Sequence, residues 1–390
     1  MKNLTAFTAL SCVFMLACCF VLIGSTADAL VVKLGMEPDQ AGRLVGILNP
    51  LFLLVACVYQ FLIGPITDRV GHKPLAIFGF LATGISMFLL YSAISLTSAK
   101  IAAGLLGLGA MSLNTVGNTI IPQVLFGGTN PARASNFGNG FFGLGIVLTP
   151  LLATFMTGTA MGTTGTILIL AILNLIFLVF ALLSKYPEAN IGFKYSTAFK
   201  LLGQAPVILA ALALFFYMGL ENTMSGFLKP YANGVFGEGN YLAGLTLTLF
   251  GVAMMAGRFI ASGYEKITEK GSTVIIIVSL ISIIPILLLL LTQNGVITIV
   301  AAILVGLAFA PIFPTVLGIT FSKYSPQYYG SIFGMIFAIG LGGSSLVVNR
   351  IGNASEVMGL QRAFIIPVIV AILLVIVSLF LGRAKPKPVD

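Results

Sequence analysis

Long apolar runs separated by short polar segments fill almost the whole chain. A helix needs about 20 predominantly apolar residues to cross a bilayer, and twelve runs reach about that length. They lie near residues 7–32, 41–63, 75–94, 99–122, 136–157, 164–184, 205–230, 241–262, 272–291, 297–321, 331–349 and 362–382. The pattern predicts an all-α polytopic membrane protein with twelve transmembrane helices.

A polar stretch divides these runs into two sets of six. We expect a six-helix bundle over residues 1–184, a cytoplasmic linker over 185–204, a second six-helix bundle over 205–382 and a cytoplasmic tail over 383–390. The segment Gly64–Lys73 after the second run has a weaker counterpart, Ala261–Lys270, after the eighth. Two related halves are typical of secondary transporters, although chance similarity between short segments is the alternative.

Composition excludes an ordinary soluble protein. Of the 390 residues, 58% are hydrophobic and 8% charged, whereas a soluble domain has about 25% charged residues. The net charge of +9 comes from basic residues spread over short segments, which predicts a role in topology rather than in nucleic-acid binding. Most Lys and Arg fall on one side if the N-terminus is inside. We therefore expect a multi-pass protein of the plasma membrane, taken to be a bacterial inner membrane, with both termini cytoplasmic.

The N-terminus also has features of a cleavable signal peptide. Met1-Lys2 precedes an apolar run that contains Ala27-Asp28-Ala29. The run is too long for the apolar core of a signal peptide, so we expect an uncleaved first helix.

The segment after the second run carries the most specific motif of the chain. It reads Gly64-x-x-x-Asp68-Arg69-x-Gly71-x-Lys73 and resembles the signature loop of the major facilitator superfamily. The resemblance implies the twelve-helix fold of that superfamily, in two pseudo-symmetric bundles. It also implies that this loop closes the cytoplasmic side when the carrier opens outward, with Glu265 and Lys266 as the counterparts in the second half. The alternative is a basic turn that only sets topology.

Three further stretches resemble one branch of the superfamily, the fucose–galactose–glucose/proton symporters. They are Phe141-Phe-Gly143-Leu-Gly145 leading to Pro150, Tyr217-x-Gly219-x-Glu221, and Ala310-Pro311-Ile-Phe-Pro314-Thr315. The chain departs from this branch at Asn114, where a carboxylate is usual, and it has no tryptophan to stack on a sugar.

Two carboxylates lie inside predicted spans. Asp28 is in the last third of the first run and Glu221 is midway along the seventh. A charge at the bilayer centre costs at least about 2.5–3.5 kcal/mol, so it needs a reason to be there. Both match acidic positions of the symporter branch, which makes them candidates for proton coupling and substrate contact. The alternatives are a solvated helix end for Asp28 and a structural hydrogen bond for Glu221.

Polar side chains in the spans provide candidate substrate ligands. Asn114 and Asn118 are four residues apart and share one helix face. The other candidates are Gln123, Asn49, Tyr217 and Asn222. An unsatisfied amide is costly in lipid, so these groups face either protein or an aqueous cavity. Hydrogen bonding between helices is the alternative to solute binding.

The remaining chemistry favours a carrier over other classes. No Lys or Arg is expected at mid-membrane depth, which favours a neutral or cationic solute. The lone histidine, His72, and the four cysteines show no spacing typical of a metal site, and no Walker sequence is present. We therefore expect neither an enzyme nor a cofactor, but a monomeric secondary transporter of a small polar, sugar-like solute, coupled to protons. A uniporter, an exporter or antiporter of a drug, nucleoside or amino acid, and a non-transporting sensor are the alternatives.

Overall fold

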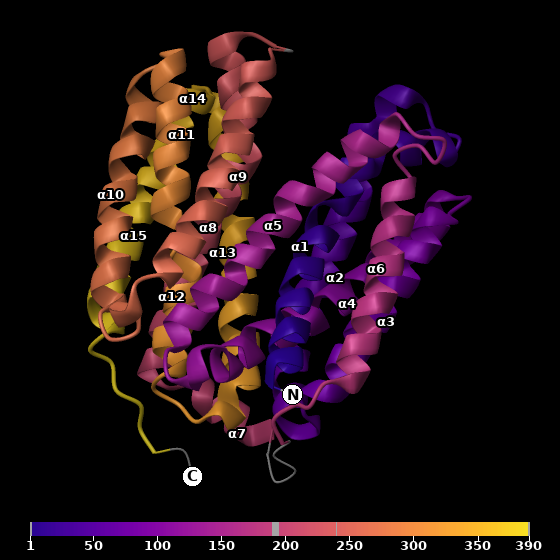
Figure 1. Cartoon of the computed structure of the whole chain (residues 1–390). Coiled ribbons are helices and arrows are strands. Elements are labelled where there is room, and N and C mark those ends of the chain that lie inside the picture. Colours follow the sequence, from indigo (N-terminus) through magenta and orange to yellow (C-terminus); the bar gives the residue numbers. More distant parts are fainter. Residues whose placement is uncertain (1, 189–194, 239, 389–390) are drawn as a thin grey trace. The chain divides into compact units, whose positions relative to one another are not determined.

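The computed structural model describes residues 2–188, 195–238 and 240–388 of the chain and is built from helices (Figure 1). Twelve helical spans are long and apolar enough to cross a membrane, which confirms the expected number. Large apolar side chains on many of them are exposed, as lipid-facing positions require. Part of the predicted linker, residues 189–194, lies outside the described residues.

Contacts along the chain define two compact units. The first comprises residues 1–124 and 141–194, and the second comprises residues 125–140 and 195–390. The boundary runs through one continuous helix, α5 (Pro131–Thr157), whose first residues belong to the second unit. We refer to Leu125–Gly140 as the latch segment. The predicted domain limits at 184, 204 and 382 stay predictions.

The first unit contains most of the N-terminal helices. They are α1 (Lys2–Lys33), α2 (Ala41–Val70), α3 (His72–Tyr91), α4 (Leu96–Val124), the later part of α5, and α6 (Gly165–Leu183), with the 3₁₀ turn η1 (Pro38–Gln40). α4 packs against α1, α2 and α3. Gly117 on α4 permits the close approach to α1, because a Cβ there would meet Val13 and the carbonyl of Ala9.

The second unit contains the remaining helices. They are α7 (Tyr195–Leu202), α8 (Ala205–Phe236), α9 (Tyr241–Ser262), α10 (Gly271–Leu291), α11 (Gly295–Phe309), α12 (Ile312–Phe321), α13 (Tyr329–Met358), α14 (Leu360–Ala363) and α15 (Ile365–Leu381), with 3₁₀ turns η2 (Leu125–Gly128), η3 (Glu265–Ile267) and η4 (Pro326–Tyr328). α8 and α13 pack side by side, and Gly343 lies against the backbone of Phe215. The tenth span breaks between α11 and α12 at Ala310-Pro311, as proline in a helix predicts.

Candidate functional site

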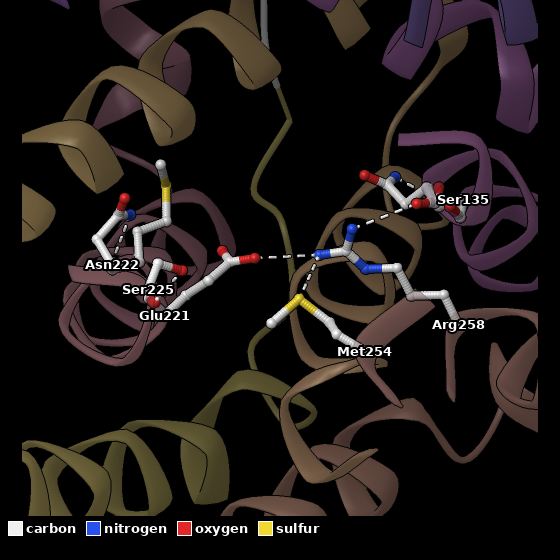
Figure 2. A network of polar contacts seen from close by, with 8 residues as sticks. Ser135, Glu221, Asn222, Ser225, Met254 and Arg258 are labelled. Atoms are coloured by element: carbon white, nitrogen blue, oxygen red, sulfur yellow. Dashed lines mark hydrogen bonds and ion pairs between the residues drawn. The ribbon is translucent and has the colours of Figure 1, made fainter. Parts of the chain in front are cut away.

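A buried ion pair joins two helices of the second unit. Glu221 lies midway along α8, and Arg258 lies in the last turns of α9. Nη2 of Arg258 donates a hydrogen bond to Oε1 of Glu221 at 3.2 Å (Figure 2). The Arg258 side chain is only 3% exposed and that of Glu221 is 21% exposed. Each charge therefore stabilises the other in a place where either alone would be costly.

The other side of the same guanidinium contacts the latch segment. Nη1 of Arg258 donates to the carbonyl oxygen of Asn139 at 3.2 Å, and Nη2 also approaches the sulfur of Met254 at 3.4 Å. Figure 2 shows the guanidinium lying between the carboxylate of Glu221 and the helix that carries Ser135. Arg258 thus links α8 to the first turns of α5.

Arg258 corrects one expectation drawn from the sequence. Arg258 lies near the end of the predicted span 241–262 and was counted with the basic residues of the cytoplasmic side, so no buried cation was expected. α9 ends at Ser262, as predicted, but Arg258 is buried in its last turns. The signal that reveals it is tertiary, because its partner Glu221 is 37 residues away in the chain.

Polar side chains next to Glu221 on α8 are exposed. Asn222 and Ser225 are both exposed, and they donate to the carbonyl oxygens of Met218 at 2.9 Å and Glu221 at 2.9 Å, respectively. Polar atoms exposed within a membrane span need water or a solute, because lipid offers no hydrogen-bond partner. We therefore expect this face of α8 to contact water or solute rather than lipid.

The neighbouring helix α13 also exposes polar groups. Ser345, Asn349 and Asn353 are exposed, and Nδ2 of Asn353 donates to Oδ1 of Asn349 at 3.1 Å. We use the name polar stripe for the half-buried Glu221 together with the exposed Asn222, Ser225, Ser345, Asn349 and Asn353. Its amides and hydroxyls both donate and accept hydrogen bonds, which suits a solute rich in hydroxyls.

Tyr217 lies one helical turn before Glu221 and is fully buried. Its hydroxyl makes no hydrogen bond of normal geometry within the described chain, but it interacts electrostatically with both Glu221 and Arg258. The sequence placed Tyr217 among the substrate ligands. In this structure it lies behind the polar stripe, close to the ion pair.

The amides of the fourth span form a separate cluster in the first unit. Asn118 Nδ2 donates to Oδ1 of Asn114 at 2.9 Å, Asn114 Nδ2 donates to Oε1 of Gln60 at 3.4 Å, and Gln60 Nε2 donates to Oγ1 of Thr115 at 3.1 Å. Asn114, Asn118 and Gln60 are all buried. The cluster joins α2 to α4, so the structure favours hydrogen bonding between helices for these residues.

The other predicted ligands of the first unit do not join this cluster. Asp28 on α1 is exposed and has no hydrogen-bond or ion-pair partner among the described residues. Asn49 on α2 is half-buried, and Nε2 of Gln123 donates to the carbonyl of Thr119 at 2.7 Å.

The signature motif forms a helix end rather than a loop. α2 includes Gly64, Asp68 and Arg69 and ends at Val70, and α3 begins at His72. The break is one residue, Gly71, with φ of 85°, which glycine adopts readily. Asp68 is buried, whereas Arg69 and Lys73 are exposed. Nε2 of His72 lies 3.0 Å from Oγ1 of Thr119, which ties the motif to α4.

The latch segment docks through an ion pair that the sequence did not predict. Nη1 of Arg133 lies 3.5 Å from Oε1 of Glu265, and Nε of Arg133 donates to the carbonyl of Ser262 at 2.9 Å. Glu265 was predicted as a gate residue, but its partner Arg133 was missed. Lys266, the other predicted gate residue of this half, is exposed.

Neutral contacts complete the docking of the latch segment. The side chain of Asn130 accepts from Thr268 Oγ1 and donates to the carbonyl of Glu265. Farther along α5, Nδ2 of Asn136 donates to Oγ1 of Thr315 on α12 at 3.0 Å. The latch segment therefore lies against the end of α9, η3 and α12.

Comparison with known proteins places these features in a family. The sequence matches the profile described as Major Facilitator Superfamily over residues 9–348. No curated protein matches the chain significantly.

Solved structures with the same fold include three transporters. A variant of the Escherichia coli fucose:proton symporter FucP gives a TM-score of 0.77 at 16% identity, covering 96% of this chain and 99% of that one. The proton:xylose symporter XylE, bound to 6-bromo-6-deoxy-D-glucose, gives 0.79 at 15% identity, covering 99% and 96%. The human organic anion transporter MFSD10 gives 0.73 at 15% identity, covering 97% and 99%. At these identities the likeness concerns the fold alone.

Proposed function

The chain belongs to the Major Facilitator Superfamily, and from that premise we propose that it is a proton-coupled secondary carrier of a small, polar, neutral solute. Alternating access of two helical bundles around a central site is the mode of transport that this fold supports. The observation that carries the proposal is the ion pair between Arg258 and Glu221, the one carboxylate of the polar stripe. Arg258 balances the charge of Glu221, so the stripe together with Arg258 presents hydrogen-bonding groups without net charge.

A hydroxyl-rich solute such as a sugar fits the polar stripe best. The stripe combines the carboxylate of Glu221 with amide and hydroxyl groups of α8 and α13, and each of these groups can bond a hydroxyl as donor or acceptor. FucP is a fucose:proton symporter and XylE is a proton:xylose symporter, which was solved with a glucose derivative. At 15–16% identity they support the substrate class only by analogy of fold.

Two carboxylates are proposed to carry the proton. Glu221 sits in the polar stripe, so a proton and a solute compete for or share the same group. Asp28 is the second acid inside a span, and its exposure lets it exchange protons with water. The distribution of Lys and Arg supports placing both termini in the cytoplasm, at a plasma membrane.

One observation favours a second candidate, an organic anion. Arg258 is a buried cation within a span. If Glu221 becomes neutral, that cation is available to a carboxylate or phosphate of the solute. Uniport of a neutral solute is the remaining alternative, and it needs no titrating group.

Transport by the purified protein in proteoliposomes tests these proposals. Sugars, organic anions, nucleosides and amino acids are screened by counterflow, which requires no proton gradient. The proposal expects a neutral polyol or sugar to exchange and to accumulate when an inward proton gradient is imposed. Accumulation should stop with a protonophore. Exchange that is insensitive to the protonophore, with no accumulation, indicates uniport, whereas exchange of an anion alone contradicts the neutral-solute proposal.

A further inference from the structure

The side chain of Arg258 contacts α5 close to the residue at which this helix passes from the second unit to the first. The carbonyl that accepts its hydrogen bond belongs to Asn139, and the next residue, Gly140, is the last of the latch segment. Beyond it, Phe141–Thr157 of the same helix belongs to the first unit. The ion pair with Glu221 is therefore tied to the point at which α5 leaves the second unit.

We propose that Arg258 is a positioning residue that couples the charge state of Glu221 to the docking of the latch segment on the second unit. This inference rests on the proposed transport role of Glu221 and adds how a change at that carboxylate reaches α5.

The coupling follows from the charge balance at a buried guanidinium. A guanidinium group carries a positive charge at physiological pH, and burial makes an unbalanced charge costly. Ionised Glu221 provides the balance and holds the guanidinium where Nη1 reaches Asn139. When Glu221 takes up a proton, or when a solute binds its carboxylate, Arg258 loses the ion pair that holds its guanidinium in place. Its position and its hydrogen bond to the latch segment then change together.

No other charged group takes the place of Arg258 in the described chain. The groups that interact electrostatically with Glu221 there are Arg258 and Tyr217. The helices packed against α8 are α7, α9, α11, α12, α13 and α15. Their other titratable or charged residues are Tyr195, Lys200, Tyr241, Tyr329, Arg350 and Glu356. A change in the charge of Glu221 is thus passed mainly to Arg258.

The contacts that Asn130, Asn136 and Arg133 make do not depend on the charge of Glu221. Asn130 and Asn136 make neutral hydrogen bonds. The Arg133–Glu265 pair lies at an exposed position, with the Glu265 side chain 80% exposed. The charge-assisted bond from Arg258 is therefore the contact through which protonation of Glu221 alters docking.

Spin labels within the second unit measure the docking directly. The full-length protein, with its four cysteines replaced, receives labels at Thr129→Cys on the latch segment and Glu269→Cys near η3, both exposed positions. Distance distributions in nanodiscs give the ratio of docked to undocked protein. Glu221→Gln should lower this ratio on the order of tenfold, the effect of losing one charge-assisted bond. Glu356→Gln on α13 is the matched control and should leave the ratio unchanged.

Two further variants separate coupling from simple loss of the ion pair. Arg258→Lys keeps a cation but lacks the fork that reaches two acceptors, so docking should lose its dependence on pH, while the protein with Arg258 intact should undock as the pH falls. The exchange Glu221→Arg with Arg258→Glu restores opposite charges, but the carboxylate cannot donate to the Asn139 carbonyl. Docking should therefore stay weak. Rescue of docking by this exchange would overturn the proposal.

Transport of the same variants distinguishes the two proposals. If Glu221→Gln abolishes accumulation but leaves the docked ratio unchanged at every pH, the coupling through Arg258 is overturned and the role of Glu221 in transport stands. If docking changes but accumulation persists, the transport role fails and the structural coupling stands. The pH titration of the labelled protein with Glu221 and Arg258 intact tests the coupling without any substitution in the ion pair.

Discussion

Gly318 on α12 lies directly against Ala132 of the latch segment. A Cβ at position 318 would overlap the Cα, N and Cβ atoms of Ala132. Both residues lie in regular helix, so the obstacle is backbone rather than the end of a flexible side chain. The absence of a side chain at residue 318 therefore sets how closely the latch segment docks on the second unit.

Gly318→Ala should weaken this docking. The added methyl group forces the latch segment away from α12, and the docked ratio between labels at positions 129 and 269 should fall several-fold. The helix itself should not suffer, because alanine is favoured over glycine by about 1 kcal/mol in a helix interior. Gly342→Ala on α13 is the control, since a Cβ there meets nothing within 4 Å. Unchanged docking in Gly318→Ala would contradict the steric argument.

Arg133 and Glu265, which form the ion pair of the latch segment, should contribute unequally to the free energy of docking. Glu265 is exposed, so Glu265→Gln should destabilise docking by about 0–1 kcal/mol, less at high salt. Arg133→Gln should cost more, about 1–2 kcal/mol, because it also removes the bond to the Ser262 carbonyl. The docked ratio of each variant at low and high salt gives both values. Equal losses would mean that the ion pair dominates.

The spans were predictable because the bilayer imposes a length and a composition. Each apolar run contains the number of residues needed to cross it, and all twelve appear as helices. The ends were not predictable in this way. α5 begins at Pro131 rather than near 136, because Asn136 and the residues before it are stabilised by contacts with α9, η3 and α12. Polar residues packed against protein extend a helix beyond its apolar part.

The candidate site was only partly predictable from the sequence, because part of it also depends on tertiary contacts. Glu221 was identified by the cost of a carboxylate within a span. Arg258 was not identified, since a basic residue near the end of a predicted span is expected at the membrane surface until its buried partner is known. For Asn114 and Asn118 the sequence left open whether they bind a solute or each other, because an amide satisfies the same chemical requirement in both cases. The hydrogen bonds from Asn114 to Gln60 and from Asn118 to Asn114 favour a structural role.

Asp28→Asn should uncouple transport from the proton. The amide has the size of the carboxyl group but takes up no proton, so accumulation driven by a proton gradient should be lost while counterflow exchange persists. Uptake and counterflow of the solute in proteoliposomes measure the two activities. Asp39→Asn, in η1 outside the spans, is the matched control and should keep both. Undiminished accumulation in Asp28→Asn would remove Asp28 from the coupling scheme and leave Glu221 as its single acid.

Asn114 and Asn222 should differ in what their loss affects. Asn114→Leu removes the amide that donates to Gln60, inside a buried cluster, and should lower the free energy of unfolding by about 1–2 kcal/mol. Asn222 is exposed in the polar stripe, so Asn222→Ala should change stability little and instead weaken solute binding several-fold. Thermal unfolding in detergent and the half-saturating solute concentration in counterflow measure the two effects. If Asn114→Leu weakens binding at unchanged stability, the amide cluster contacts the solute after all, and α4 contributes to the solute site.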